Sequence, residues 1–315
     1  MGRRRSFLLS GCAAVVLLVL MGCQATPSRT DGRLRIVATT TIVADLARQL
    51  GGEAVEVTAL MGPGIDPHLY RASEGDVARM QQADLVLYNG LHLEGKMTEV
   101  FERMRALGRQ TLAVAECVPD SLRLRASGFG GVYDPHVWMD VRRWQFAARC
   151  VAETLARMDT ARAAFFRDRL AAYLAELDST DAYVRRRSAL LPPERRVLIT
   201  SHDASRYFGD AYSWEVHGLL GVSTASEAGA ADVQQLAEFI VARRVPAIFV
   251  ESSVPERYLR ALQEAVAARG FSVRLAGPLY SDALGDPGSP AGTYTGMIRT
   301  NINTIVEALH EAPLP

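Results

Sequence analysis

The sequence predicts an α/β protein of two lobes, each with a mainly parallel sheet flanked by helices, joined by one long helix. The first observation is that apolar, strand-like runs alternate with helical stretches of about ten residues in both halves of the chain, which is typical of βαβ units. The second is that residues 161–190 contain neither glycine nor proline. The third is the length of 315 residues, which suits two domains.

The elements of the first lobe follow in chain order. Strands are predicted at residues 33–40, 54–61, 84–88 and 110–116, where short apolar runs occur. Helices are predicted at residues 42–50, 74–82, 97–107 and 144–158. The glycine pair at residues 130–131 marks a loop before the last of these helices. This lobe is expected to span residues 33–160.

The long segment that follows has apolar residues at helical spacing, including Phe166, Leu170, Tyr173 and Leu177. It ends at two consecutive prolines, residues 192–193, which cannot continue a helix. A continuous helix of this length measures about 40 Å, too long for a crossover helix within a compact domain. Residues 161–191 are therefore expected to link the two lobes as a rigid strut.

The second lobe, expected at residues 192–315, repeats the alternation. Strands are predicted at residues 196–200, 247–250 and 271–275, with a further short strand near residues 216–222. Helices are predicted near residues 233–242, 256–268 and 293–309. Because ligands of parallel α/β sheets bind at the carboxyl ends of the strands, the crevice between the lobes is the expected binding site.

The first residues of the chain are typical of an export signal. Three arginines at residues 3–5 precede an apolar run at residues 13–21 that is too short to span a bilayer. The run ends in Leu-Met-Gly-Cys, which resembles the lipobox of bacterial lipoproteins, in which the cysteine becomes the lipidated first residue. Residues 1–22 are therefore predicted to be a signal peptide and residues 23–32 a tether lipidated at Cys23. A plain signal peptide with a chance cysteine is the alternative.

Cysteines and net charge limit the remaining possibilities. Cys117 and Cys150 remain in the mature, exported chain and can pair there, but two buried free thiols are the favoured expectation. Sequence does not give the Cα–Cα distance that decides between them. The formal net charge of zero argues against a nucleic-acid-binding protein, which normally carries a basic excess.

Candidate metal ligands follow four of the predicted strands. His68 and His136 each end an Asp-Pro-His triplet in the first lobe, and the proline stiffens the backbone beside the histidine. His202 comes just after the strand predicted at residues 196–200 of the second lobe. Asp282 lies in the segment after the strand predicted at residues 271–275. Three imidazoles and one carboxylate suit a divalent transition metal ion. All four are expected to face the crevice between the lobes.

The other histidines are expected to lie outside this site. His92 also follows a strand and is the strongest rival as a ligand. His217 lies in an apolar stretch and is expected to be buried or half-buried. His310 lies near the end of a helix and is expected to be exposed.

Three further carboxylates lie close to the candidate ligands in sequence or at strand ends. Glu251 follows an apolar strand, and we expect it to support a ligand rather than to bind the metal directly. Asp66 and Asp134 begin the two Asp-Pro-His triplets and can steady nearby groups, but the sequence does not identify their partners.

Taken together, the motifs resemble the TroA-like metal-specific solute-binding proteins of ABC importers for manganese, zinc or iron. The matching stretches, in order, are IVATTTIVADLARQLGG, GIDPHLY, ADLVLYNGLHLEG, DPHVWMDV, TSHDASRYFGDAY, IFVESSV, LYSDALG and YTGMIRTNINTIVEAL. The resemblance covers nearly all of the mature chain. It implies the two-lobed fold with one long linking helix, and it implies that His68, His136, His202 and Asp282 hold the metal.

Two departures from subgroups of this family bear on the metal. Zinc-specific members often carry a loop rich in histidine and acidic residues before the second ligand, whereas residues 118–132 contain no histidine. Many manganese-specific members have glutamate at the third ligand position, where this chain has His202. Nitrogen donors suit zinc and oxygen donors suit manganese. The expected cargo is one divalent transition metal ion, manganese or zinc, with iron also possible.

The expected function is that of an extracytoplasmic solute-binding protein that captures the metal and delivers it to an ABC permease with its ATPase. The chain is expected to be a monomer, anchored by lipid on Cys23 to the outer side of the plasma membrane, or in the periplasm or outer membrane. A zinc metalloenzyme is an alternative, but four protein ligands leave no open position for water and no HExxH motif occurs. An adhesin-like surface protein is the other alternative.

Overall fold

The structure is a computed structural model that describes residues 32–126 and 132–310. The predicted signal peptide, Cys23, nearly all of the predicted tether and the glycine pair at residues 130–131 lie outside the described residues. Within the described ranges, no helix is both long enough and apolar enough to cross a membrane.

The first lobe is built on a four-stranded parallel sheet in the order β2-β1-β3-β4. Its strands are β1 (Leu34–Ala38), β2 (Val55–Ala59), β3 (Leu85–Tyr88) and β4 (Gln110–Ala113). Its helices are α1 (Thr41–Gly51), α2 (Glu74–Gln82), α3 (Thr98–Ala106) and α4 (Val141–Met158). One face of the sheet packs on α1 and α4 and the other on α2 and α3, so both faces are covered, as is usual for parallel sheets.

Local sequence signals explain where these helices begin. Thr40 caps α1 by accepting a hydrogen bond from the Val43 amide. Ser73 caps α2 in a capping box with Asp76. Asp140 caps α4, which therefore starts three residues earlier than its apolar periodicity indicated.

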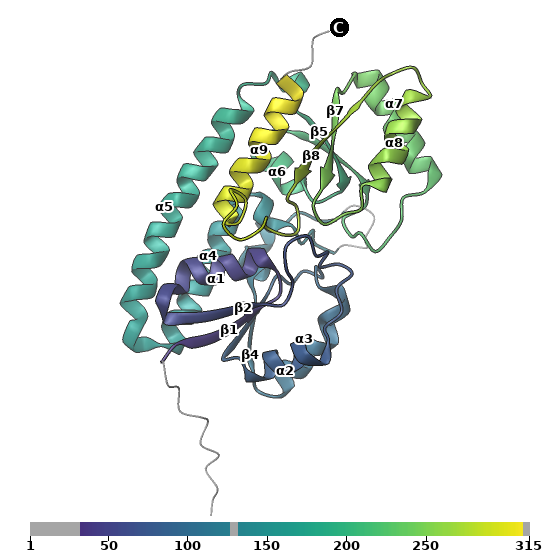
Figure 1. The fold of residues 1–315 in the computed structure, drawn as a ribbon. Coiled ribbons are helices and arrows are strands. Elements are labelled where there is room, and N and C mark those ends of the chain that lie inside the picture. Colours follow the sequence, from purple (N-terminus) through teal and green to yellow (C-terminus); the bar gives the residue numbers. More distant parts are fainter. Residues whose placement is uncertain (1–31, 127–131, 311–315) are drawn as a thin grey trace, which may run out of the picture. The chain divides into compact units, whose positions relative to one another are not determined.

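The long linking helix is α5 (Ala163–Ser188), which packs on α1 and α4 of the first lobe and on two helices of the second, α6 (Arg206–Tyr212) and α9 (Tyr294–His310) (Figure 1). The second lobe has a four-stranded parallel sheet in the order β6-β5-β7-β8. Its strands are β5 (Val197–His202), β6 (Glu215–Leu220), β7 (Ala247–Glu251) and β8 (Arg274–Leu279). Its helices are α6 (Arg206–Tyr212), α7 (Ala230–Arg243), α8 (Arg257–Ala267) and α9 (Tyr294–His310). The predicted fold class is confirmed.

Three elements differ from the sequence prediction. The strand predicted at residues 271–275 starts at Arg274 and continues through Pro278, and a proline is tolerated there because β8 is an edge strand of its sheet. The strand predicted to reach residue 116 ends at Ala113 and gives way to a short 3-10 turn, Val114–Cys117. Helix α6 was not predicted. Its central Gly209 is unusual within a helix, and a Cβ atom there would lie 2.8 Å from the Trp214 carbonyl oxygen.

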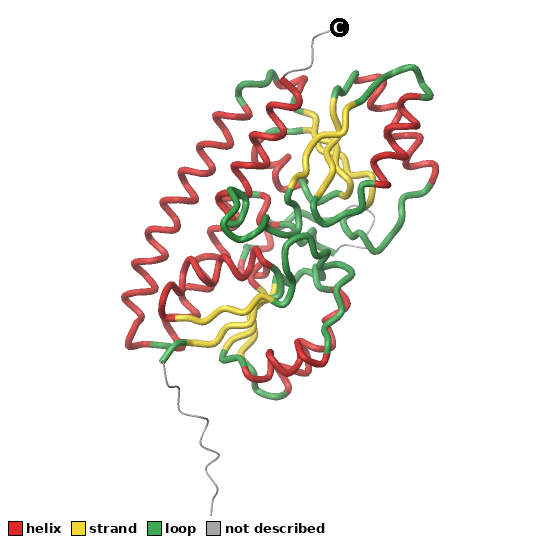
Figure 2. Tube along the Cα trace, viewed as in Figure 1, coloured by secondary structure: helices red, strands yellow, loops and turns green. Residues whose placement is uncertain are grey.

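The loops that follow the strands of both sheets gather between the lobes (Figure 2). An apolar cluster of the described residues runs from α1, α4 and α5 to α9 and β7, so the two lobes share packed core. The lobe boundaries at residues 160 and 191 therefore stay a prediction, since the described chain from Arg33 onward packs as one compact unit.

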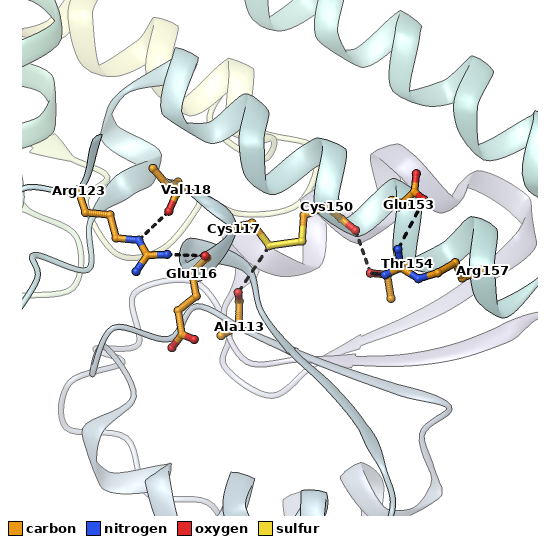
Figure 3. Close-up of a disulfide and its surroundings, with 9 residues drawn as sticks. All are labelled: Ala113, Glu116, Cys117, Val118, Arg123, Cys150, Glu153, Thr154 and Arg157. Carbon is orange, nitrogen blue, oxygen red and sulfur yellow. Dashed lines mark hydrogen bonds and ion pairs between the residues drawn. A yellow bond between two sulfur atoms is a disulfide. The ribbon is translucent and has the colours of Figure 1, made fainter. Parts of the chain in front are cut away.

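A disulfide joins Cys117, at the end of the turn after β4, to Cys150 in α4 (Figure 3). The favoured expectation of two free thiols is therefore wrong. The two Cα atoms are 6.2 Å apart, within the range that a disulfide spans. This proximity depends on the packing of the turn against α4, which the separation of the two cysteines in sequence does not reveal.

Candidate metal centre

The four candidate ligands come together between the lobes from four different segments. His68 lies in the loop after β2, and His136 lies in the loop that leads into α4. His202 is the last residue of β5, and Asp282 follows β8. One potential ligand atom from each residue lies within 4.8 Å of the others, and all four residues are buried.

The atoms that face the centre of this cluster have no hydrogen-bond partner among the described residues. They are the Nε2 atoms of the three histidines and Oδ1 of Asp282. The His136 Nε2 atom lies 3.6 Å from Asp282 Oδ1, and the His202 Nε2 atom lies 3.4 Å from Asp282 Oδ2. A buried polar atom without a partner is unfavourable, and four of them at one point fit a shared divalent cation. The donor set of three imidazoles and one carboxylate suits a four-coordinate transition metal ion.

The repeated Asp-Pro-His triplet produces the same turn at both histidines of the first lobe. Asp66 Oδ1 accepts a hydrogen bond from the His68 amide at 2.9 Å, and Asp134 Oδ1 accepts one from the His136 amide at 3.0 Å. Such side chain to backbone bonds fix the conformation two residues further on. The triplet therefore sets the backbone at both ligands before any metal arrives.

Carboxylates also orient two of the imidazole rings. Asp134 Oδ1 lies 2.8 Å from His136 Nδ1, and Glu251 Oε1 lies 3.0 Å from His202 Nδ1. Glu251 Oε2 also accepts a hydrogen bond from the His202 amide at 2.8 Å. A carboxylate on Nδ1 places the proton there and leaves Nε2 as the free donor atom. The structure thus places Glu251 against a candidate ligand, and it gives Asp134 a partner that the sequence could not identify.

The charges around the cluster shift the pKa of its members in opposite directions. Burial lowers the pKa of His68 to about 3, although Asp282 opposes this effect. Burial also disfavours the charged form of His202, but the Glu251 and Asp282 carboxylates outweigh it and raise the pKa of His202 well above its ordinary value. The pKa of Asp282 lies below its usual range, because the neighbouring histidines, above all His202, outweigh the effect of burial. The site therefore holds an ionised carboxylate in a buried position, which favours a cation.

Hydrogen bonds between the lobes frame the site next to the ligands. The Trp138 indole, two residues after His136, donates to the Ser281 carbonyl oxygen at 2.8 Å. The Tyr207 hydroxyl donates to the Asp134 carbonyl oxygen at 3.0 Å. Both bonds are buried, and each joins the two lobes close to the candidate ligands. They therefore help to fix the ligands of the first lobe relative to those of the second.

The remaining histidines lie outside the cluster. His92 is exposed in the loop after β3, with φ of 65°, and it lines a cavity that His68 also lines. His217 is half-buried on β6, where it packs on Phe239 and its Nε2 atom lies 3.2 Å from Glu215. His310 is exposed at the end of α9.

Comparison with known proteins agrees with this site and fold. The family model described as ZnuA, zinc-uptake complex component A, periplasmic, matches residues 36–308. The zinc-binding protein TroA of Treponema pallidum is 48% identical over 303 residues, which is 95% of this chain and 97% of the relative. The manganese-binding lipoprotein MntA of Bacillus subtilis is 42% identical over 304 residues, 96% of each chain.

Solved structures give the same result. The periplasmic zinc-binding protein TroA from Treponema pallidum superposes with a TM-score of 0.86 at 50% identity, over 88% of this chain and 99% of that structure. The family model matches most of this chain. In this chain, three histidines and one aspartate form the buried cluster. The chain therefore belongs to the ZnuA family of periplasmic zinc-uptake components.

Proposed function

We propose that this chain is the extracytoplasmic solute-binding protein of an ABC importer, which binds one divalent transition metal ion, zinc or manganese, between its lobes. The observation that carries the proposal is the convergence of four buried, unpartnered donor atoms. The relatives named for zinc and for manganese, at 48% and 42% identity, support the class of cargo. An ABC permease with its ATPase would receive the metal, and the chain would act as a monomer.

The proposed ligands are His68, His136, His202 and Asp282. Glu251 would support His202 through its contact with the Nδ1 atom of that ring. Three nitrogen donors favour zinc, whereas manganese prefers a larger share of oxygen donors. With these four ligands, protein atoms would fill all four positions of a tetrahedral site, which would leave no place for the reactive water of a catalytic zinc. This agrees with the family, whose members take up metal and are not enzymes.

Metal binding is expected to stabilise the protein against heat, because the ion joins residues from both lobes. A ligand present at about 100 times its Kd adds about 2.7 kcal/mol to the free energy of unfolding. Differential scanning calorimetry of chelator-treated protein should therefore show a higher melting temperature after addition of zinc or manganese than of magnesium. An unchanged melting temperature with both transition metals would contradict the proposed function.

Metal affinity is expected to fall as the pH is lowered. In the metal-free site the Glu251 and Asp282 carboxylates raise the pKa of His202 well above its ordinary value, so this ring holds a proton more tightly and metal binding must displace that proton. His68, with a pKa of about 3, is already neutral and adds no such dependence above about pH 4. Calorimetric titration with zinc in buffers of different ionisation enthalpy should show release of at least one proton per ion. Affinity that stays constant between about pH 5 and about pH 7 would contradict this assignment.

We further propose that the protein is anchored through lipid on Cys23 after removal of residues 1–22. The order of arginines, apolar run, small residue and cysteine supports it, as does the lipoprotein relative from Bacillus subtilis. Mass spectrometry of the membrane-associated protein should find a lipidated N-terminal Cys23, and Cys23→Ser should be released or remain unprocessed. A mature chain that begins elsewhere without lipid would refute the anchor.

A further inference from the structure

We propose that Asp66 and Thr224 form a latch between the lobes that holds His68 in place and slows release of the bound metal. The latch is the hydrogen bond between these two side chains. This inference rests on the proposed function, because it concerns how long the same site retains its ion.

The carboxylate of Asp66 joins the two lobes directly beside a candidate ligand. Its Oδ1 atom accepts a hydrogen bond from the His68 amide at 2.9 Å. Its Oδ2 atom accepts a hydrogen bond from the Thr224 hydroxyl at 2.6 Å. Thr224 follows β6 in the second lobe, 158 residues further along the chain. One side chain therefore connects the backbone of His68 to the opposite lobe.

Other contacts place the same loop of the first lobe, residues 62–69, against the second lobe. Gly64 has φ of +71°, and a Cβ atom at this position would lie 3.3 Å from the Ser252 carbonyl oxygen, just after β7. Val222 and Ser223, immediately before Thr224, line the same cavity as His68. The hydrogen bond between Asp66 and Thr224 thus belongs to a broader closed contact.

His68 is the ligand that this contact best controls. It is 4% exposed, whereas His136 and His202 are fully buried, so His68 is the outermost imidazole of the site. Leu69, the next residue in the chain, is 50% exposed. An ion that leaves by the shortest route must first lose the ligand nearest to solvent. A restraint on His68 is therefore a restraint on dissociation.

The latch is suited to opening and closing. Asp66 and Thr224 are both half-buried, so water can replace either partner when the lobes separate. Each lobe supplies two of the four candidate ligands, and release of the metal requires the two pairs to part. The latch acts only in the closed protein, because the hydrogen bond between Asp66 and Thr224 is absent while the lobes are apart. It should therefore affect the dissociation rate more than the association rate.

The test compares Thr224→Val, which removes the hydroxyl but keeps the branched shape, with Thr224→Ser, which keeps the hydroxyl. Full-length mature protein is loaded with one equivalent of zinc and mixed with excess chromophoric chelator in a stopped-flow instrument. Thr224→Val should release zinc about two- to tenfold faster than wild type, the range of a single hydrogen bond's net contribution. Thr224→Ser should release zinc at close to the wild-type rate. Ser226→Ala, at an exposed position two residues away, is the matched control.

Several outcomes would overturn the latch. One is that Thr224→Val releases zinc at the wild-type rate while wild type still binds zinc. That result would refute the latch but leave the proposed function standing. Another is an equal change in association and dissociation rates together with a lower melting temperature of the metal-free variant, which would indicate a general role in folding. If wild type binds neither zinc nor manganese, the proposed function fails and the latch falls with it.

Discussion

Replacing His202 by alanine is expected to weaken zinc binding by more than about 100-fold. Loss of a group that only supports a ligand already costs about 10- to 100-fold in metal affinity, and loss of the ligand itself costs more. The variant also leaves the carboxylates of Glu251 and Asp282 buried with one fewer polar partner. Competition against a chelator of known affinity measures the change, and circular dichroism establishes that the variant is folded.

The exposed and half-buried histidines provide the controls. His217→Ala and His310→Ala remove an imidazole of the same chemistry from positions outside the cluster, and they should leave zinc affinity within a few-fold of wild type. If a folded His202→Ala protein binds zinc as tightly as these controls, His202 is not a ligand.

A second variant at this position separates ligation from packing. His202→Glu keeps a donor but exchanges nitrogen for a carboxylate oxygen, so the zinc-to-manganese affinity ratio should fall. The new carboxylate would lie close to Glu251 and Asp282, both buried, and absolute affinity should fall as well. An unchanged ratio in a folded variant would mean that residue 202 does not contact the metal.

Loss of the disulfide between Cys117 and Cys150 is expected to lower the free energy of unfolding by about 3 to 4 kcal/mol. The bond joins positions 33 residues apart, and the estimate is the chain entropy that closing such a loop removes from the unfolded state. His136 lies between the two cysteines in the sequence, so the loop closed by the bond includes it. Urea unfolding of metal-free wild type and of Cys117→Ala/Cys150→Ala measures the difference.

The single variants serve as controls for this measurement. Cys117→Ala and Cys150→Ala each abolish the bond, so each should lose nearly as much stability as the double variant. Reduction of the wild type with a dithiol should have a similar effect. The disulfide would be contradicted if the unreduced, folded wild type has two titratable thiols and the double variant has the same free energy of unfolding as wild type.

The sequence predicted those features that depend on local patterns. The strand and helix alternation predicted both sheets, and the absence of glycine and proline predicted α5. The rule that ligands gather at the carboxyl ends of parallel strands predicted the meeting of His68 and His202 from opposite lobes.

The features that escaped prediction depend on contacts between distant segments. The disulfide requires the turn after β4 to pack on α4, and the partner of Glu251 lies on a neighbouring strand. Thr224 lies in a loop whose sequence gives no sign of a bond to Asp66. Such pairs become visible only when segments that are distant in the sequence are placed together by the fold.

Zinc K-edge X-ray absorption of the protein loaded with one equivalent of zinc tests the central claim most directly. The account predicts four nitrogen or oxygen neighbours at about 2.0 to 2.2 Å, with outer-shell scattering from three imidazole rings and none from sulfur. Both cysteines of the described chain are joined in a disulfide, so no thiolate from them is available. A sulfur neighbour at about 2.3 Å, or scattering from fewer than three imidazoles, would contradict a site made of His68, His136, His202 and Asp282.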